Sequence, residues 1–451
     1  MIVMKFGGTS VGSAEAMRGV ARIVAARRAE RPIVVVSAVS GVTNKLIAAA
    51  QGAQRRTVEP EAAVAELTAL HERICDDLGV PRSLVDKPLR RFGEVLRGIY
   101  FLRELTARSL DYVQTFGEIL SSSIVAAHFE REGMPARAIS GWDAGLVTDD
   151  RYGEAEVLPE SFGQLHDRLV PLVEQGIIPI VTGFIARTRT GERTTLGRGG
   201  SDYTAALVGR GVGAREIQIW TDVSGILSAD PRVVPDAQVL RQLTFDEASE
   251  LAYFGAKVLH PKTIEPAVQA DIPVRILNTF APDDPGTVVT RVAGDRGDRS
   301  VEGLAVKRGN LLVNITSTRM LGAEGYMARI FDLFHRHGVS VDAIATSEVS
   351  VSVTVDARFK DRLHAALPEL EGFARVRVEP DRAIVCVVGN GMRFKPGISG
   401  RIFSTLGEAG VNIEMISQGS SELNVTFVVT DDDAHKAMRA LHQTFLGASA
   451  V

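Results

Sequence analysis

Short aliphatic runs alternate with amphipathic stretches over the first two thirds of the chain. The runs lie at residues 1–6, 32–39, 176–184 and 216–223, and apolar residues recur at helical spacing over 13–28. Uninterrupted Ile/Val runs that end in Gly, Ser or Thr are typical of parallel strands buried on both faces. Their alternation with helices predicts an α/β sheet covered on both sides, which binds its ligands at the carboxyl ends of the strands.

The pattern changes in two places. Residues 60–132 show a helical pattern without strands and include a polar stretch at 115–123. Residues 281–299 are rich in Pro, Gly and Asp, a composition typical of a loop between domains. We therefore predict a first domain over residues 1–295.

An internal repeat follows this loop. Residues 325–344 align without gaps on 397–416, and seven of the 20 aligned positions are identical. The same offset of 72 residues pairs two strand patterns of the first copy with two of the second, namely 311–317 with 383–389 and 351–355 with 423–427. Each copy reads strand, helix, strand, strand, and a further helix follows the second copy. Two copies are too few for a solenoid, so we predict a paired α/β module.

Length and charge narrow the class of protein. The chain has 451 residues, whereas a single core stops growing at about 250–300 residues, so at least two domains are expected. The 51 basic and 55 acidic side chains leave a net charge of −4. This charge gives no reason to expect nucleic acid or an anionic membrane as the partner, and favours a small molecule.

Cysteine and histidine usage argues against several kinds of site. Cys75 and Cys386 lie far apart, which predicts neither a disulfide nor a thiolate metal site and fits a reducing compartment. The nine histidines form no HExxH pattern, so we assign no metal-ligating residue. The chain shows no signal-peptide pattern, and no uncharged apolar run reaches the roughly 18 residues of a membrane span. We expect a cytoplasmic protein.

Two glycine-rich turns are candidate anion sites. The first, Lys5 to Ser10, follows a strand, so its backbone N–H groups and its lysine could face a phosphate, although an ordinary turn would look similar. No Gly-Lys dipeptide and no GxGxxG spacing occur, which excludes a Walker A loop and a dinucleotide fingerprint. The second turn, residues 196–202, combines three glycines with Arg198 and Asp202. Arginine offers a planar fork to an anion, and a simple turn would not need all of these residues.

Other polar residues near predicted strand ends and helices can each be interpreted in two ways, as ligand-binding or as structural. Thr221 and Asp222 could hydrogen-bond a nucleotide or form an Asx-type turn. Lys257 could meet phosphates or be a solvated helix residue. Glu118 lies among apolar residues and serines, where a carboxylate needs a partner, either a structural Lys or Arg or the ammonium group of a ligand.

Taken together, these motifs resemble the aspartate kinase (aspartokinase) family. The segments that carry the resemblance occur in order along the whole chain: KFGGTSVGS at 5–13, SGVTN at 40–44, FGEILSS at 116–122, TLGRGGSDYTAA at 195–206, WTDVSGILSADPR at 220–232 and FGAKVLHP at 254–261. The resemblance implies an amino-acid-kinase fold, which is a three-layer αβα arrangement around a mainly parallel sheet. The repeat resembles two ferredoxin-like βαββαβ ACT domains, expected at 300–378 and 379–451, with the end of the chain able to pack back into the first.

The resemblance also implies a reaction, in which ATP with Mg²⁺ phosphorylates L-aspartate to 4-phospho-L-aspartate. The acceptor is a carboxylate with a pKa of about 3.9, which is already ionised at neutral pH and needs no general base. This chemistry fits the absence of a catalytic histidine motif. The obstacle is repulsion between an anionic acceptor and a polyanionic nucleotide, which cations and backbone N–H groups must offset.

By similarity, the family's roles fall on matching positions. Lys5 would stabilise the transferred phosphoryl group, and Asp202 would hold Lys5 or organise the metal region. Arg198 would bind the α-carboxylate of aspartate and Glu118 its ammonium, and the full set of implied aspartate-binding residues is Thr43, Glu118, Arg198, Gly199, Gly200 and Ser201. The implied ATP-binding residues are Lys5, Gly7, Gly8, Thr9, Thr221, Asp222, Arg232 and Lys257. Leu227 stands where some relatives place an aromatic ring beside the nucleotide.

Residues 337–353 are similar to the first ACT domain of monofunctional, lysine-sensitive aspartokinases. The resemblance makes the following residues candidates for binding lysine as an inhibitor: Met320, Tyr326, Ser340, Val341, Asp342, Ser347 and Glu348. Asp342 and Glu348 are anionic, as a side-chain ammonium requires, although solvated loop residues would look the same. A ligand between paired modules implies at least a homodimer. The sequence leaves open whether lysine, threonine, both or neither inhibits, and whether the chain forms a dimer or a tetramer.

Three other functions deserve comparison. Another amino-acid kinase, acting on glutamate, acetylglutamate or UMP, would share the fold. Such a kinase lacks the sequence found here around Glu118 and Arg198, and it lacks the pair of ACT domains. A bifunctional aspartokinase–homoserine dehydrogenase is excluded by length and by the missing dinucleotide loop. A non-catalytic amino-acid sensor would predict decayed loops at Lys5 and Arg198, and both loops are intact.

Overall fold

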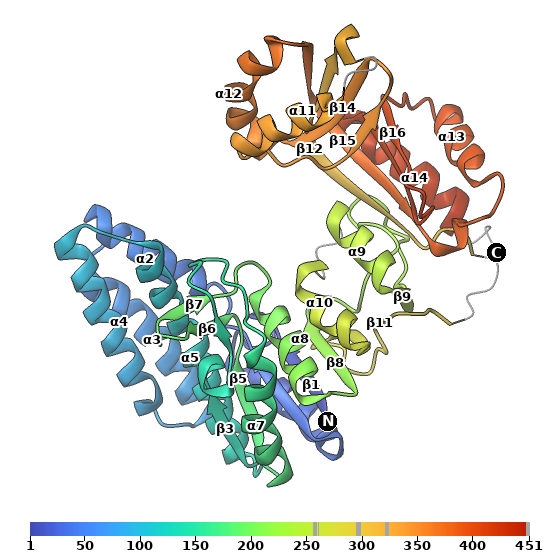
Figure 1. The fold of residues 1–451 in the computed structure, drawn as a ribbon. Coiled ribbons are helices and arrows are strands. Elements are labelled where there is room, and N and C mark those ends of the chain that lie inside the picture. The colour runs from blue at the N-terminus through green and yellow to red at the C-terminus, as the bar shows by residue number, and fades with distance from the viewer. Residues whose placement is uncertain (256–258, 260, 295–298, 321–323, 448–451) are drawn as a thin grey trace. The chain divides into compact units, whose positions relative to one another are not determined.

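Two compact units make up the chain. The computed structural model describes residues 1–255, 259, 261–294, 299–320 and 324–447. The first unit comprises Met1–Ile226, Arg241–Phe245 and Leu259–Ala293, and the second comprises Leu227–Leu240, Asp246–Val258 and Gly294–Val451. Two short segments that precede the predicted boundary therefore group with the C-terminal part of the chain (Figure 1).

An eight-stranded sheet organises the first unit, in the order β3-β5-β2-β1-β8-β10-β11-β9. Its strands are β1 (Ile2–Phe6), β2 (Pro32–Val36), β3 (Ala136–Ile139), β5 (Ile178–Thr182), β8 (Glu216–Thr221), β9 (Gln242–Thr244), β10 (Val274–Asn278) and β11 (Thr287–Thr290). Neighbours run parallel from β3 to β10, and β11 is antiparallel to β10. The Ile/Val runs thus form the predicted parallel strands. The segment 281–299, which we expected to be a loop throughout, contains β11, because Thr287 to Val289 pair with Val274 to Ile276.

Helices cover the sheet. Those of the first unit are α1 (Ala14–Ala26), α2 (Val42–Arg55), α3 (Pro60–Leu78), α4 (Ser83–Leu102), α5 (Ala107–Arg131), α6 (Gly141–Ala144), α7 (Glu160–Glu174), α8 (Gly200–Val212) and α10 (Pro261–Ala270), with a 3-10 turn at Arg28–Glu30. The predicted helical region 60–132 is the run α3, α4 and α5. The side chain of Ser13 accepts a hydrogen bond from the N–H of Ala16 and caps α1, as a serine before an apolar helix predicts. A small sheet of β4 (Val147–Thr148), β6 (Ile185–Thr188) and β7 (Arg193–Thr195) completes the unit.

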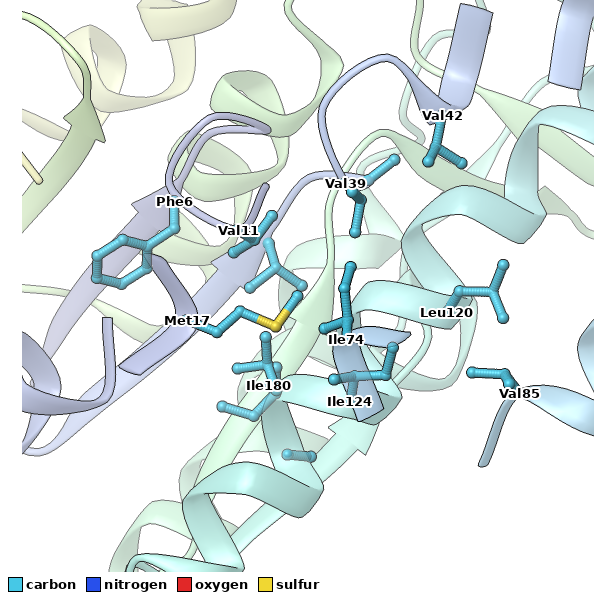
Figure 2. Packing of buried hydrophobic residues seen from close by; sticks show 14 of the residues in the cluster. Phe6, Val11, Met17, Val39, Val42, Ile74, Val85, Leu120, Ile124 and Ile180 are labelled. Carbon is cyan, nitrogen blue, oxygen red and sulfur yellow. The ribbon is translucent and has the colours of Figure 1, made fainter. Parts of the chain in front are cut away.

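The two faces of β1 explain where its lysine points. Side chains alternate along a strand, and Ile2, Met4 and Phe6 belong to the same buried cluster as residues of α1 to α5. Figure 2 shows this cluster, with Phe6 near Val11 and Met17 of the α1 region. Lys5 therefore lies on the opposite face, the side where α8 contacts β1. The register of the sheet places Lys5 between Val35 of β2 and Ile219 of β8.

The second unit contains a six-stranded sheet in the order β13-β14-β12-β15-β17-β16. The strands are β12 (Gly303–Thr316), β13 (Ile344–Thr346), β14 (Ser350–Asp356), β15 (Arg375–Val388), β16 (Met415–Ser417) and β17 (Asn424–Thr430). The helices are α9 (Phe245–Phe254), which starts in the first unit, α11 (Tyr326–Arg336), α12 (Lys360–Glu371), α13 (Ile398–Glu408) and α14 (Asp431–Leu446), with 3-10 turns at Thr318–Met320, Ala357–Phe359 and Asn390–Met392. A helix follows the last strand of each repeat, whereas the sequence pattern showed one only after the second.

Two long strands serve both repeats. The second half of β12, from Asn310 to Thr316, pairs with β14, and its first half, Gly303 to Lys307, pairs with the part of β15 that joins β17. The segment before the first repeat thus supplies the fourth strand of the second repeat. The sequence allows the end of the chain to pack back into the first repeat. In the structure, α14 packs into the core of the second repeat, where Leu441 is fully buried.

Candidate active site

The first glycine-rich turn brings a lysine to the carboxyl edge of the sheet. Lys5 lies near the end of β1, and its Nζ is 2.7 Å from Oδ1 of Asp202 in the first turn of α8. Both side chains are mostly buried, with exposed fractions of 10% and 17%. Glycine favours the close approach at position 8, because a Cβ there would lie only 3.1 Å from the carbonyl oxygen of Ala38. The turn therefore places an ammonium group, paired with a carboxylate, at this edge of the sheet.

The second glycine-rich turn starts α8. Gly199 caps the helix with a φ of +70°, a conformation that favours glycine. A Cβ on Gly200 would lie 2.5 Å from Cδ2 of Phe184, so the close approach of these two segments also requires glycine. Arg198 is exposed, and it forms no ion pair among the residues that the structure describes. Its guanidinium is available to an anionic ligand.

Glu118 is a buried carboxylate with spare capacity. Its Oε1 accepts a hydrogen bond from the N–H of Ala38 at 3.2 Å, while Oε2 is buried without a hydrogen-bond partner in the described part of the chain. Burial raises the pKa of Glu118 to about 8, and the hydrogen bond from Ala38 opposes this shift. Gly117 permits the close packing, because a Cβ there would lie 2.7 Å from Cβ of Ala38. Of the two readings that the sequence left open, no structural Lys or Arg partner of Glu118 occurs among the described residues.

One cavity of about 560 Å³ joins these groups. Its lining residues within the described part of the chain all belong to the first unit. They include most of the predicted substrate and nucleotide residues, namely Lys5, Gly7, Gly8, Thr9, Thr43, Glu118, Arg198, Gly199, Gly200, Ser201, Asp202, Thr221 and Asp222. Thr221 ends β8, and its hydroxyl donates to Oδ1 of Asp222 at 3.1 Å. The cavity sits where β1, β2 and β8 end, which is the expected position for a ligand in an open α/β sheet.

The described lining of the cavity does not include the predicted nucleotide-binding residue Arg232. Arg232 belongs to the second unit, where its side chain is exposed and pairs with Asp230 at 2.6 Å. Lys257 lies outside the described residues. Leu227, the position of the departure from the family pattern, also belongs to the second unit.

Several lining residues were not predicted individually. They are Ser37, Ala38, Val39, Ser40, Gly41, Phe184 and Gly197. Phe184 has a φ of +66°, which is rare for an aromatic residue, and its N–H donates to the Thr204 hydroxyl at 3.0 Å. The signal that could have found most of them is their position, because residues 37–41 follow β2 and Phe184 follows β5 at the same edge of the sheet as Lys5, while Gly197 follows β7.

The candidate effector residues lie in the second unit around the turn after α11. Asp342 is nearly buried, with Oδ2 2.5 Å from Nζ of Lys307 and Oδ1 accepting a hydrogen bond from the Tyr253 hydroxyl at 2.8 Å. Lys307 also lies 3.3 Å from Asp356. Neither Lys307 nor Tyr253 was predicted, because their separation from residue 342 in the sequence gives no sign of contact. Asp342 is thus engaged within the chain.

The other candidate effector residues are less constrained. The Ser347 side chain hydrogen-bonds that of Ser350 at 2.6 Å, and Glu348 is exposed. Ser340 is exposed and Val341 half-buried in the turn itself. Met320 ends a 3-10 turn, and Tyr326 begins α11 with its hydroxyl donating to the carbonyl oxygen of Phe373 at 3.2 Å.

Metal and membrane features add little to this picture. Among the described residues, no group of three or more His, Cys, Asp or Glu side chains could hold a metal ion. In the same part of the chain, no helix has the length and apolar character needed to cross a membrane.

The fold and the cavity agree with comparisons to known proteins. The sequence model of the amino acid kinase family matches residues 1–278, and a model of the ACT domain matches residues 313–367 and 385–445. The match covers more than half of the chain, and the chain belongs to the amino acid kinase family, with ACT domains after the kinase domain.

Within that family the chain is a member of the aspartokinases. It is 40% identical to aspartokinase 2 of Arabidopsis thaliana, over 98% of this chain and 84% of that protein. It is 36% identical to lysine-sensitive aspartokinase 3 of Escherichia coli, over 98% of both chains. The solved structure of E. coli aspartokinase III with aspartate and ADP superimposes with a TM-score of 0.82 at 34% identity, covering 98% of this chain and 99% of that one. The same enzyme with lysine and aspartate gives a TM-score of 0.80 at 34% identity and 99% coverage of both chains.

Proposed function

We propose that this chain transfers the γ-phosphoryl group of ATP to the β-carboxylate of L-aspartate, giving 4-phospho-L-aspartate and ADP. The observation that carries the proposal is the charge pattern of the cavity. A paired lysine, an arginine without an ion pair among the described residues and a buried carboxylate with a free oxygen line the same space. An amino-acid substrate with two carboxylates and one ammonium complements all three.

Aspartate recognition uses the two side chains with spare capacity. Arg198 forks the α-carboxylate, because a guanidinium can donate two parallel hydrogen bonds to a carboxylate. The α-ammonium donates to Oε2 of Glu118, which is buried without a partner among the described residues. This contact also supplies the positive charge that a buried carboxylate needs to remain ionised. Thr43, Gly199, Gly200 and Ser201 complete the wall on the same side.

Phosphoryl transfer then depends on charge rather than on proton transfer. The acceptor β-carboxylate is already ionised at neutral pH and attacks without a general base. Lys5 brings an ammonium to the point where the anionic acceptor meets the nucleotide, and Asp202 fixes its position at 2.7 Å. The backbone N–H groups of Gly8 and Thr9 offer further donors at the same turn, whereas the N–H of Gly7 donates to the carbonyl oxygen of Trp220 at 3.1 Å. Such donors act most strongly on charge that develops in the transition state.

The nucleotide and its metal fit the remaining groups. Thr221 and Asp222 stand at the end of β8 for the nucleotide, and we assign Arg232 and Lys257 the same role by similarity. The donor set suits Mg²⁺, which takes one or two carboxylates together with phosphate oxygens. Asp222 would hold the ion, with Asp202 nearby in the same cavity, and the ion would neutralise phosphate charge.

Lysine is the effector that the second unit supports best. Asp342 already accepts a primary ammonium, that of Lys307, so its surroundings accommodate the group that distinguishes lysine from threonine. Met320, Tyr326, Ser340, Val341, Ser347 and Glu348 would form the rest of the site by similarity. An effector with an uncharged side chain, such as threonine, could offer only its α-ammonium to the carboxylate of Asp342.

We also propose that the chain forms a homodimer or a larger homo-oligomer. Ile344 and Ile416 occupy equivalent positions of the two repeats, 72 residues apart, and their side chains are 40% and 45% exposed. They lie on β13 and β16, the two edge strands of the sheet, and the Ser417 hydroxyl donates to the carbonyl oxygen of Ile344. Exposed apolar residues on adjoining edges are typical of an interface.

A cytoplasmic location agrees with the two buried free cysteines.

The test is formation of an acyl phosphate, trapped with hydroxylamine, in a reaction that contains the purified chain, ATP, Mg²⁺ and one acceptor. Aspartate should give the hydroxamate, whereas glutamate and N-acetylglutamate should give none. UMP would give UDP, which hydroxylamine does not trap, so release of ADP is measured for this acceptor and should not exceed the background. The Lys5→Met variant controls for contaminating kinases. Product with another acceptor but not with aspartate would contradict the proposal, and no product with any acceptor in a folded protein would favour a non-catalytic sensor.

A further inference from the structure

A second cavity lies on the far face of the helix that carries Glu118. Glu118 and Ser121 of α5 face β2, where the Ser121 hydroxyl donates to the carbonyl oxygen of Ser37. Phe116 and Ile119 of the same helix line a separate space of about 320 Å³ between α4, α5, β3 and α6. We call it the Arg193 cavity, and its lining residues are Lys87, Pro88, Arg91, Phe116, Ile119, Ser122, Ser123, Ala138, Ile139, Ser140, Trp142, Asp143, Thr182 and Arg193. None of them lines the catalytic cavity.

Arg193 is a half-buried cation held mainly by aromatic rings. Its guanidinium carbon lies 4.2 Å from the ring centroid of Tyr112 and 4.9 Å from that of Trp142, and Nη1 donates to the Thr115 hydroxyl at 2.8 Å. Burial lowers the pKa of Arg193, and the charge of Arg91 acts in the same direction. Among the described residues, no carboxylate forms an ion pair with it. The aromatic contacts compensate only part of the cost of removing this charge from water.

The neighbouring charges do not supply the missing anion. Lys87 lines the same cavity and also has no ion pair among the described residues, while Arg91 is paired with Glu94 at 2.8 Å. Asp143 is the acidic residue of the lining, and it is exposed at the rim, where it accepts the hydroxyl of Ser140. The inner wall of the Arg193 cavity is therefore positive.

The rest of the wall favours an apolar body. Phe116, Ile119, Ile139, Trp142 and Pro88 contribute carbon surface. The hydroxyls present are already engaged within the chain. Those of Ser122 and Ser123 donate to the carbonyl oxygen of Ile119, and that of Thr182 accepts from the N–H of Gly141. A sugar or another polyol would find few free partners here.

We propose that the Arg193 cavity binds a small carboxylate with an apolar body, with the carboxylate on the guanidinium of Arg193. An apolar α-amino acid is the form of this ligand that also uses Asp143, because its ammonium can reach the rim while its side chain covers Trp142 and Ile119. The volume of about 320 Å³ suits a molecule of this size. The site is distinct from the aspartate and lysine sites proposed above.

The position of this site couples it to the catalytic cavity through the chain. Arg193 begins β7, and the same strand runs through Thr195 directly into Leu196, Gly197 and Arg198. Helix α5 carries the other wall of the Arg193 cavity and, on its opposite face, Glu118. A ligand here contacts the two elements that present the proposed aspartate-binding charges.

The test is a binding titration of the full-length protein that needs no catalysis. The chain has two tryptophans, and Trp142 lines the cavity whereas Trp220 is fully buried against Phe6. L-leucine and L-phenylalanine should give a saturable change in tryptophan fluorescence, measured in the presence of saturating aspartate. The change should vanish in Trp142→Phe, while calorimetry still detects heat of binding.

Variants decide which groups hold the ligand. Arg193→Met should weaken leucine binding roughly 10- to 100-fold, the usual effect of losing hydrogen bonds to a charged group. Arg193→Lys should show an intermediate loss. Arg189→Met is the matched control, because Arg189 lies on the same hairpin but is exposed and paired with Glu160. Equal melting temperatures of the variants show that binding, rather than folding, has changed.

Ligand analogues distinguish an amino acid from a simple organic acid as the bound ligand. Leucinol lacks the carboxylate and should not bind. Weaker binding of 4-methylpentanoate than of leucine, with the difference lost in Asp143→Asn, assigns an amino acid, and equal binding of the two assigns a simple organic acid. The proposal is overturned if no apolar carboxylate binds, if inorganic phosphate alone binds, if leucine competes with aspartate, or if Arg193→Met binds leucine as tightly as the wild type.

Discussion

Two buried carboxylates in different parts of the molecule are proposed to receive an ammonium group, and they differ in what they already hold. Glu118 in the kinase unit has one oxygen bonded to the N–H of Ala38 and one without a hydrogen-bond partner among the described residues. Asp342 in the ACT unit has both oxygens engaged, one by the Tyr253 hydroxyl and one by the ammonium of Lys307. The carboxylate of the proposed substrate site thus has a free oxygen, whereas the carboxylate of the proposed effector site is already engaged within the chain.

This difference separates catalysis from regulation. Aspartate adds a missing partner at Glu118, so its binding needs no internal contact to break. In the proposed effector site, lysine would have to take the place of Lys307 at Asp342, and its binding would rearrange contacts within the second unit. A ligand shifts a conformational equilibrium only through contacts that differ between the two states. The proposed replacement of the Lys307 ammonium by that of the effector at Asp342 would change such a contact.

The largest expected effect concerns Lys5. If the ammonium neutralises charge that develops in the transition state, Lys5→Met should lower kcat by roughly 10²–10⁴ and leave ATP binding largely intact. Steady-state kinetics and a nucleotide-binding titration measure the two quantities separately. A folded Lys5→Met protein with normal turnover would remove Lys5 from the reaction.

Next in size is the loss of the two aspartate contacts. Arg198→Ala and Glu118→Gln should each lower kcat/KM for aspartate, because each removes a charged hydrogen bond to substrate. The expected loss of transition-state stabilisation is about 2–4 kcal/mol for each variant. The KM for ATP should change far less. Arg189→Met, an exposed arginine of the same unit, serves as the control. An unchanged KM for aspartate in either variant would exclude that residue from the substrate site.

The pH dependence of aspartate binding sharpens the account of Glu118. Its pKa is raised to about 8 from the usual 4.5, so the ligand-free carboxyl is protonated below that pH. Only the ionised form can hold an ammonium. The KM for aspartate should therefore fall about tenfold per pH unit as the pH rises toward 8, and then level off. Glu118→Gln should lack this dependence.

The same shift makes a prediction for stability. A carboxyl with a raised pKa stabilises the ligand-free fold while it is protonated in the folded state, and this contribution is lost as the pH rises from about 4.5 to 8. Thermal melts of the wild type and Glu118→Gln should diverge across this window, with the wild type losing more stability. Parallel curves would show that Glu118 has an ordinary pKa.

The smallest expected effect concerns the exposed effector residues. Glu348→Ala and Ser347→Ala should weaken lysine inhibition and leave the uninhibited rate nearly unchanged, because both residues lie outside the kinase unit. If inhibition acts through binding, saturating lysine should lower the affinity of the wild type for a substrate by about 5- to 150-fold. Inhibition curves with lysine, threonine and methionine, alone and in pairs, measure the effect. Threonine inhibition that both variants leave intact, without inhibition by lysine, would identify a different effector.

Local patterns in the sequence were sufficient for part of the catalytic cavity. Strand runs end in glycine-rich turns, and parallel strands bring such turns to one edge, which predicted a ligand site there. The family resemblance, rather than this pattern, added Glu118 of α5 and the roles of Lys5, Arg198 and Asp202. The contact between Lys5 and Asp202, which are far apart in the sequence, fits that topology. Phe184 escaped because nothing in its sequence signals a positive φ.

Contacts that depend on strand exchange could not be predicted. The first half of β12 crosses into the second repeat, and Lys307 reaches Asp342 only because of the path that this long strand takes. Strand β11 lay hidden in a segment rich in Pro and Gly, because its pairing with β10 rather than its composition makes it a strand. The aromatic surroundings of Arg193 combine α5, α6 and β7, and no single segment reveals them.

The most direct test of the comparison is calorimetric titration of lysine into the wild type and into Lys307→Met. Removing Lys307 leaves Asp342 without its cation, so lysine should bind Lys307→Met more tightly and raise its melting temperature more than that of the wild type. Arg308→Met, which changes the adjacent basic residue, should behave like the wild type. Weaker or unchanged lysine binding in a folded Lys307→Met protein would contradict the account, because Lys307 would then not occupy the effector's place.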